Sequence, residues 1–192
     1  MLKIILIIVA VIILLILGIS IYYGAFNSIN IKKEKKESFW IVFEPFVGPY
    51  KNTGPIMDKL YYKLLNDESI ETFKGFGIYY DNPREVEELL CRSIVGSVIE
   101  KKDLDKIEFL KNKGYKILEI KESEYVTSEF AYKGKFSIIF GIFKVYPKLS
   151  AYLEKNNSVK APMMEIYDIP NKVINYSTPT SENIFPKFDD VK

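Results

Sequence analysis

The first 23 residues of the chain are almost continuously apolar, whereas polar residues are frequent everywhere beyond them. The segment Ile4–Tyr23 contains 20 residues and no charged side chain. At about 1.5 Å of rise per residue, a helix of this length crosses a hydrocarbon core of about 30 Å. We therefore predict a transmembrane helix at residues 4–23, followed by a basic juxtamembrane neck at residues 24–37.

The charges on either side of this segment predict its orientation. Lys3 precedes the apolar segment, and four lysines follow it in the neck: Lys32, Lys33, Lys35 and Lys36. The positive-inside rule places the C-terminal bulk in the cytosol and residues 1–3 in the lumen. A cleavable signal peptide is the alternative, because Gly18 and Ser20 are small residues two apart. Glycosylation sequons at residues 156–158 and 175–177 favour that alternative, while the single cysteine, Cys91, fits a reducing compartment better.

Hydrophobic periodicity beyond the neck predicts an alternation of strands and helices. Strands are expected at residues 38–47, 72–80, 91–99, 115–120, 125–132, 162–169 and 172–176, and helices at 53–66, about 103–113 and 135–155. Pro147 lies inside the last helix and predicts a kink or break there. The order strand-helix-strand-strand thus occurs twice, around an inserted helix and strand. This duplication predicts an α+β domain over residues 38–176, with the helices on one face and a groove between the halves.

Composition excludes several classes of function. The chain has no histidine and one cysteine, so Ser-His-Asp and Cys-His catalysis, histidine-bound metals and thiolate clusters are excluded. Gly75 and Gly77 lack the spacing of a phosphate-binding loop. Lys3 and the neck lysines account for the formal net charge of +2, which leaves the folded part near neutral and without the basic face of a nucleic-acid binder. We expect no enzyme activity, no cofactor, no metal site and no bound nucleic acid.

Several short blocks resemble a known family. They are Val47-Gly48-Pro49-Tyr50 followed by Thr53-Gly54, then Tyr79-Tyr80-Asp81-Asn82-Pro83, then Cys91-Arg92 with Val95-Gly96-Ser97. In this order and spacing they are similar to the testis-expressed ER-phagy receptor family, over roughly residues 22–176. The resemblance implies a single-pass endoplasmic reticulum membrane protein with a cytosolic, gyrase-inhibitor-like effector-binding domain. It also implies an adaptor role in reticulophagy.

The same resemblance draws attention to Glu165. In the wider superfamily, a glutamate in the strand after the second helix often lines the ligand cavity, and Glu165 occupies the matching place. Strand alternation puts Met163, Glu165 and Tyr167 on one face. A carboxylate among aromatic and thioether groups could hold a cationic apolar ligand through charge and cation-π attraction. The alternative is that Glu165 points to water from a half-exposed strand.

The C-terminal residues 177–192 lose all periodicity and are rich in Pro, Ser and Thr, so they are predicted to be disordered. Near their end, Phe188-Asp189-Asp190-Val191 resembles the motif by which autophagy receptors bind ubiquitin-like autophagosomal proteins. There Phe188 and Val191 would enter two apolar pockets by strand addition, while Asp189 and Asp190 would meet basic groups. About a dozen residues separate this motif from the fold, a reach of roughly 40 Å when fully extended.

Two functional hypotheses follow. The first is a membrane-anchored ER-phagy adaptor that recruits an autophagosomal ubiquitin-like protein through Phe188 and Val191, and whose folded domain contacts a protein client or ligand. The second is a membrane-tethered small-molecule-binding domain that uses Glu165 and has no role in autophagy.

Overall fold

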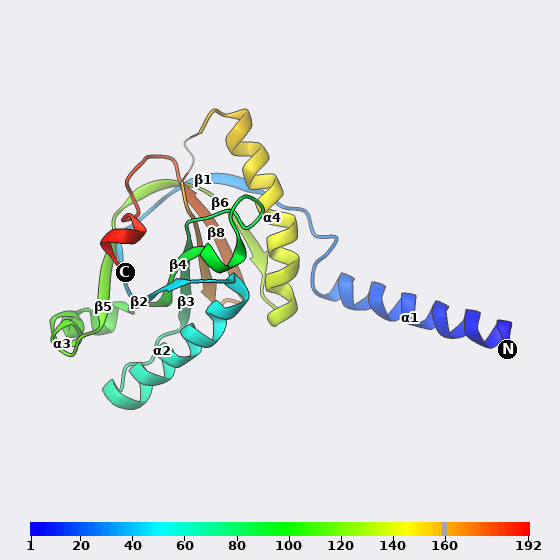
Figure 1. Ribbon diagram of the computed structural model, residues 1–192, viewed down its shortest axis with the longest axis horizontal. Coiled ribbons are helices and arrows are strands. Elements are labelled where there is room, and N and C mark those ends of the chain that lie inside the picture. Colours follow the sequence, from blue (N-terminus) through cyan, green and yellow to red (C-terminus); the bar gives the residue numbers. More distant parts are fainter. Residues whose placement is uncertain (159–160) are drawn as a thin grey trace.

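The computed structural model describes residues 1–158 and 161–192, which form a long apolar helix and a curled antiparallel sheet covered by helices (Figure 1). The helices are α1 (Leu2–Tyr22), α2 (Thr53–Glu68), α3 (Ile107–Asn112) and α4 (Lys135–Lys155). The strands are β1 (Ile31–Lys36), β2 (Phe39–Val47), β3 (Lys74–Tyr79), β4 (Arg92–Val98), β5 (Lys116–Ile120), β6 (Ser123–Ala131), β7 (Met163–Asp168) and β8 (Val173–Pro179). The described residues also form the 3-10 helices η1 (Tyr50–Asn52), η2 (Glu88–Leu90), η3 (Lys101–Lys106) and η4 (Phe188–Asp190).

The sheet confirms the predicted duplication. Its strand order is β1-β6-β8-β7-β3-β4-β2-β5, and every neighbouring pair is antiparallel. The units β2-α2-β3-β4 and β6-α4-β7-β8 each place their third strand between the first and the second. The second strands of the two units, β3 and β7, pair at the centre. The α+β fold predicted from the periodicity is therefore correct, and the two halves meet along β3 and β7.

Strand alternation divides the core between the two faces of this sheet. On the helix side, one cluster lies beneath α2 and α3 and includes Val42 and Leu64, and a second lies beneath α4 and includes Val145 and Tyr176. On the opposite side, a third cluster includes Phe76 of β3 and Met164 of β7. The central strands are thus packed on both faces.

The neck predicted at residues 24–37 is wrong in its second half, because Ile31–Lys36 is strand β1 and pairs with β6. Alternation puts Lys32, Glu34 and Lys36 on one face. The Glu34 carboxylate lies 2.8 Å from Lys32 Nζ and 2.7 Å from Lys36 Nζ. These ion pairs let a lysine-rich sequence form an edge strand, where charged side chains also discourage pairing with other chains.

Of the kink or break predicted at Pro147, the break does not occur, since α4 runs from Lys135 to Lys155 with Pro147 inside it. A proline within a helix leaves the carbonyl four residues earlier without its N–H partner. Here that carbonyl belongs to Phe143, and Phe143 and Pro147 are both exposed. The free carbonyl can therefore bond to water instead, and the helix continues.

The C-terminal segment corrects the prediction of a disordered tail at residues 177–192. Strand β8 extends to Pro179, and the residues beyond it fold back over the face of the sheet opposite the helices. Phe185 and Phe188 are buried in the cluster that contains Phe76, and Ile184 and Val191 pack against it. The apolar side chains of Ile184, Phe185, Phe188 and Val191 are therefore part of the core, whereas Lys187, Asp189 and Asp190 between them are exposed.

Helix α1 projects away from the domain, on the side where α4 lies (Figure 1). Among the described residues, it is the helix that is long and apolar enough to cross a membrane, and none of its residues is buried by the domain. Its bounds, Leu2–Tyr22, differ by one or two residues from the predicted span.

Candidate functional site

A large groove lies on the helix side of the sheet, between α2 and α4 and above β3 and β7. It has a volume of about 1960 Å³, larger than the 300–1,000 Å³ typical of enclosed ligand pockets. Its walls are mostly apolar and aromatic, with Met57 and Tyr61 from α2 and Ile138, Ile142 and Tyr146 from α4. The groove therefore lies at the junction of the two halves, where the duplication predicted one.

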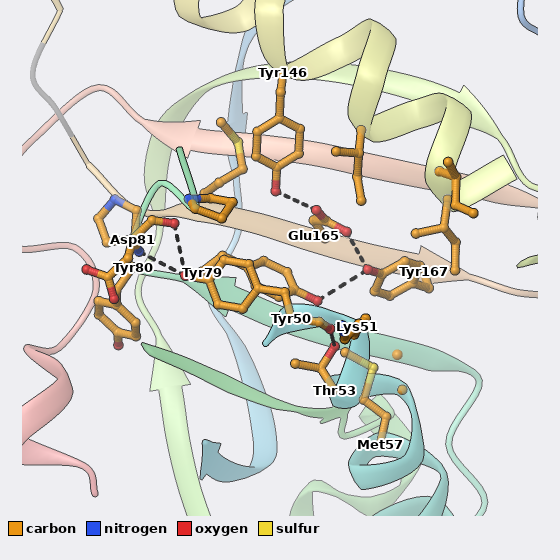
Figure 2. A pocket seen from close by; sticks show the side chains of 18 of the residues that line it. Tyr50, Lys51, Thr53, Met57, Tyr79, Tyr80, Asp81, Tyr146, Glu165 and Tyr167 are labelled. Atoms are coloured by element: carbon orange, nitrogen blue, oxygen red, sulfur yellow. Dashed lines mark hydrogen bonds between the residues drawn. The ribbon is translucent and has the colours of Figure 1, made fainter. Parts of the chain in front are cut away.

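Glu165 of β7 forms the floor of this groove and is only 2% exposed. Its two carboxylate oxygens accept hydrogen bonds from different elements: Tyr146 Oη of α4 donates to Oε1 at 2.5 Å, and Tyr167 Oη of β7 donates to Oε2 (Figure 2). The alternative that Glu165 points to water is thus wrong. A carboxylate offers about four lone-pair positions, so two protein donors leave acceptor capacity for a ligand.

Two glycines of β3 make room for the aromatic rings on this floor. Gly75 is opposite Tyr167 in the β3–β7 register, and Gly77 is opposite Glu165. A Cβ atom at Gly77 would lie 2.9 Å from the Tyr79 ring, and one at Gly75 would touch the Tyr167 ring at 3.4 Å. Because neither glycine has a side chain, Tyr79 and Tyr167 lie close over β3, with their hydroxyl oxygens 3.4 Å apart.

Tyr50 extends the tyrosine cluster toward the edge of the groove. Its ring packs edge-on against Tyr79, with centroids 4.8 Å apart (Figure 2). The Tyr50 hydroxyl lies 2.9 Å from the Asp81 carbonyl and 3.0 Å from the Arg92 carbonyl, and it accepts the Asp81 N–H at 3.0 Å. Arg92 in turn donates to both carboxylate oxygens of Asp81, at 2.8 and 2.9 Å. This bidentate pair fixes the loop that follows β3.

Burial determines the protonation of the site. It raises the pKa of Glu165 above its ordinary value, and the hydrogen bonds from Tyr146 and Tyr167 partly oppose that shift. The pKa of each neighbouring phenol, Tyr79, Tyr146 and Tyr167, is also raised, first by burial and then by the charge of Glu165. The phenols therefore keep their protons at neutral pH and act as donors, and Glu165 is their acceptor, the group at the floor that becomes charged when it ionises.

The structure brings together Met163, Glu165 and Tyr167 as predicted, since all three line the groove. It places Phe188 and Val191 elsewhere, against the opposite face of the sheet, while Asp189 and Asp190 are exposed on η4. Tyr50, Tyr79 and Tyr146 also lie in this site but were not predicted as site residues. Ile142 and Tyr146 are four residues apart on one side of α4, and this spacing was the signal available for Tyr146.

Metal binding has no support in the part of the chain that the structure describes. No group of three or more Asp, Glu and Cys side chains is arranged there to hold an ion. Cys91, which is a free and buried thiol, lies outside the residues that line the groove.

The curled duplicated sheet and the aromatic groove with a buried carboxylate define a small-molecule-binding domain of the effector-binding class. Residues 30–183 match the GyrI-like family, described as a GyrI-like small molecule binding domain. This chain belongs to that family. The match begins at β1, which agrees with the structural boundary of the domain.

The chain is also similar to two curated proteins. The chain is 26% identical to mouse testis-expressed protein 264 homolog over 132 residues, which are 66% of this chain and 41% of that protein. It is 30% identical to human testis-expressed protein 264 over 99 residues, 49% of this chain and 32% of that one. The chain thus spans less than half the length of these relatives.

The fold is also similar to the crystal structure of the EcmrR C-terminal domain. The TM-score is 0.56 at 8% identity, and the match covers 80% of this chain and 98% of that one. At such low identity the similarity concerns the fold alone.

Proposed function

We propose that this protein binds cationic amphiphilic small molecules in the groove above Glu165, and that α1 anchors it in a membrane. The observation that carries the proposal is the buried Glu165 carboxylate at the floor of an apolar groove. An isolated charge in such a place is costly unless it is compensated. A ligand with a cationic centre next to Glu165 supplies the compensating charge, and its apolar parts contact the walls.

The surrounding tyrosines support the cationic character of the ligand. Protonated phenol rings have electron-rich faces that attract quaternary ammonium groups. Tyr79 and Tyr167 supply such rings beside Glu165, and Tyr146 closes the site from above (Figure 2). Among the described residues that line the groove, the other acidic side chains are exposed (Asp58, Glu85 and Glu154) or, for Asp81 with its side chain 8% exposed, already paired with Arg92. We therefore assign the role of counter-ion to Glu165.

The test compares Glu165→Gln with the parent chain in lipid nanodiscs, titrated with octyltrimethylammonium and with the uncharged alcohol 1-octanol. Glutamine keeps the shape of the side chain and removes its charge. We expect the variant to bind the cation at least tenfold more weakly, a change of about 1.4 kcal/mol, while its weak response to octanol stays the same. Glu154→Gln is the matched control, because Glu154 lines the exposed part of the groove. Equal cation affinity in parent and Glu165→Gln would reject the proposal.

A second candidate is the reticulophagy adaptor in the endoplasmic reticulum membrane, with its domain in the cytosol. Its support is the similarity to testis-expressed protein 264. The burial of Phe188 means that Ile184–Lys192 would first have to leave the sheet before an autophagosomal ubiquitin-like protein could bind.

Charge reversal tests this candidate without disturbing the core, since Asp189 and Asp190 are exposed. If the motif functions, the double substitution Asp189→Lys, Asp190→Lys abolishes pull-down of the ubiquitin-like protein. The substitution Glu122→Lys at another exposed site serves as control. Pull-down that survives the double substitution removes the adaptor role of this motif.

A further inference from the structure

Three large apolar side chains are exposed along one face of α4: Phe136 (57% exposed), Ile139 (49%) and Phe143 (68%). Their spacing of three and four residues aligns them on the surface of the helix that faces away from Val145 and Leu149, which contact the sheet. Ile142, also exposed, lies beside them. A contiguous exposed apolar patch of this kind marks an interaction surface. We call these four residues the α4 apolar face.

The end of α1 is fastened next to this face. Lys144 of α4 donates from Nζ to the carbonyls of Ala25 and Asn27, both at 2.5 Å. Lys133, just before α4, donates to the Tyr22 carbonyl at 2.8 Å, and the Tyr23 ring packs edge-on against Phe136 with centroids 5.5 Å apart. The chain immediately after α1 is hydrogen-bonded to Lys133 and to α4, so α1 is joined directly to the folded domain. The α4 apolar face therefore begins where α1 ends.

The directions of the two helices fit a membrane surface. In Figure 1, α1 runs across the view, and α4 runs roughly upright beside the C-terminal end of α1. If α1 crosses a bilayer, α4 consequently lies along the surface of that bilayer. The side chains at this junction are those enriched at membrane interfaces, with Tyr22, Tyr23 and Phe26 around the end of α1 and Lys133 and Lys135 at the start of α4.

We infer that the α4 apolar face rests in the interfacial layer of the same bilayer that α1 enters, so that the domain lies on the membrane and does not swing free above it. This inference depends on the proposal that α1 is a membrane anchor. Phe136, Ile139 and Phe143 insert among the lipid headgroups, and the exposed Lys135 meets the phosphates. Ile139, Ile142 and Phe143 also line the groove, so the groove opens beside the lipid.

The test uses the full chain reconstituted in phosphatidylcholine vesicles, with an environment-sensitive fluorophore attached at Phe143→Cys. The native Cys91 is buried, and the unsubstituted chain, treated in the same way, measures any labelling there. Phe109→Cys is the matched control, because Phe109 is also an exposed phenylalanine (46%) but lies on α3, on the far side of the domain from α1 (Figure 1). Lipids that carry a spin label near the headgroup are the quencher.

We expect several-fold stronger quenching at position 143 than at position 109, together with a blue-shifted emission at position 143. Equal, weak quenching at both positions in protein that floats with the vesicles would overturn the inference and leave the anchor intact. Protein that does not float with the vesicles would remove both. Octyltrimethylammonium binding, measured on the same samples, reports the proposed function separately.

Discussion

The two faces of the central strands β3 and β7 differ in how they are covered: one face is the floor of an open groove, and the other is closed by packed apolar side chains. On the helix side, β3 and β7 present Gly75, Gly77, Glu165 and Tyr167, and the space above them remains an open groove. On the other side, the same strands present apolar residues such as Phe76 and Met164, and the C-terminal segment closes over them. Alternation thus gives one strand two functions, a ligand floor and a packed core.

The difference shows where the stability of this fold originates. Close-packed apolar contacts on the closed face favour folding, whereas a buried carboxylate and glycines in strand interiors weaken the open face. Features that reduce stability without an obvious structural gain are typical of functional sites. The contacts on the closed face therefore offset the free-energy cost of the open face. Substitutions on the closed face should mainly lower stability, and substitutions on the open face should also change ligand binding.

The largest effect is expected from Phe188→Ala on the closed face. Phe188 is 5% exposed and packs edge-on against Tyr80, with ring centroids 5.7 Å apart. Truncation of a buried phenylalanine removes its apolar burial and leaves a cavity, at a cost of about 3–5 kcal/mol. The free energy of unfolding, measured in urea by the fluorescence of the single tryptophan Trp40, should fall by that amount.

The exposed Phe109 provides the control for this substitution, since Phe109→Ala should change the free energy of unfolding by less than about 0.5 kcal/mol. If Phe188→Ala proves as mild as Phe109→Ala, the C-terminal segment does not close the sheet. The comparison between the two faces would then be wrong, and Phe188 would be free to act in a binding motif.

A smaller effect is expected from Tyr146→Phe on the open face. This change removes one of the two protein donors to Glu165 and keeps the aromatic ring. Removing one partner of a buried hydrogen bond costs about 1–3 kcal/mol, so the free energy of unfolding of the variant should fall by an amount in that range. Its affinity for octyltrimethylammonium should also fall, because Glu165 retains its proton more readily.

Tyr62, exposed on α2, supplies the corresponding control. The substitution Tyr62→Phe should leave both the free energy of unfolding and the cation affinity unchanged. An unchanged cation affinity in Tyr146→Phe would mean that the ligand does not depend on the charge of Glu165.

The sequence predicted the open face better than the closed one. Period-2 and period-3.6 patterns located α2, α4 and seven of the strands, because each buries a regular stripe against a neighbour. Strand β1 was not predicted because it has no apolar alternation. Its Lys32 and Lys36 form ion pairs with Glu34 of the same strand. The closing segment was not predicted because Phe185 and Phe188 follow no period, and their burial depends on a surface formed by distant strands.

The site was predicted in part for a similar reason. Alternation within β7 is local, so Met163, Glu165 and Tyr167 could be assigned to one face from the sequence. The contact between Tyr146 and Glu165 joins a helix to a strand and depends on how α4 crosses the sheet. Gly75 and Gly77 do not have the spacing of a phosphate-binding loop. Their role is to leave room for the rings of Tyr167 and Tyr79, and this depends on contacts that the local sequence does not show.

The smallest expected effect is a pH dependence that belongs to the open face alone. Burial raises the pKa of Glu165 above its ordinary value of 4.5, so the folded state holds this proton at a pH where the unfolded chain has released it. Proton uptake therefore favours the folded state. The free energy of unfolding of the parent should fall, relative to Glu165→Gln, as the pH rises above 4.5, and the difference should level off once Glu165 is ionised in the folded state.

Urea titrations of both chains between pH 4 and 8 measure this difference, in which the other titrating groups cancel. Parallel curves would mean that Glu165 titrates normally, and the cost assigned to the open face would then have to arise from its glycines.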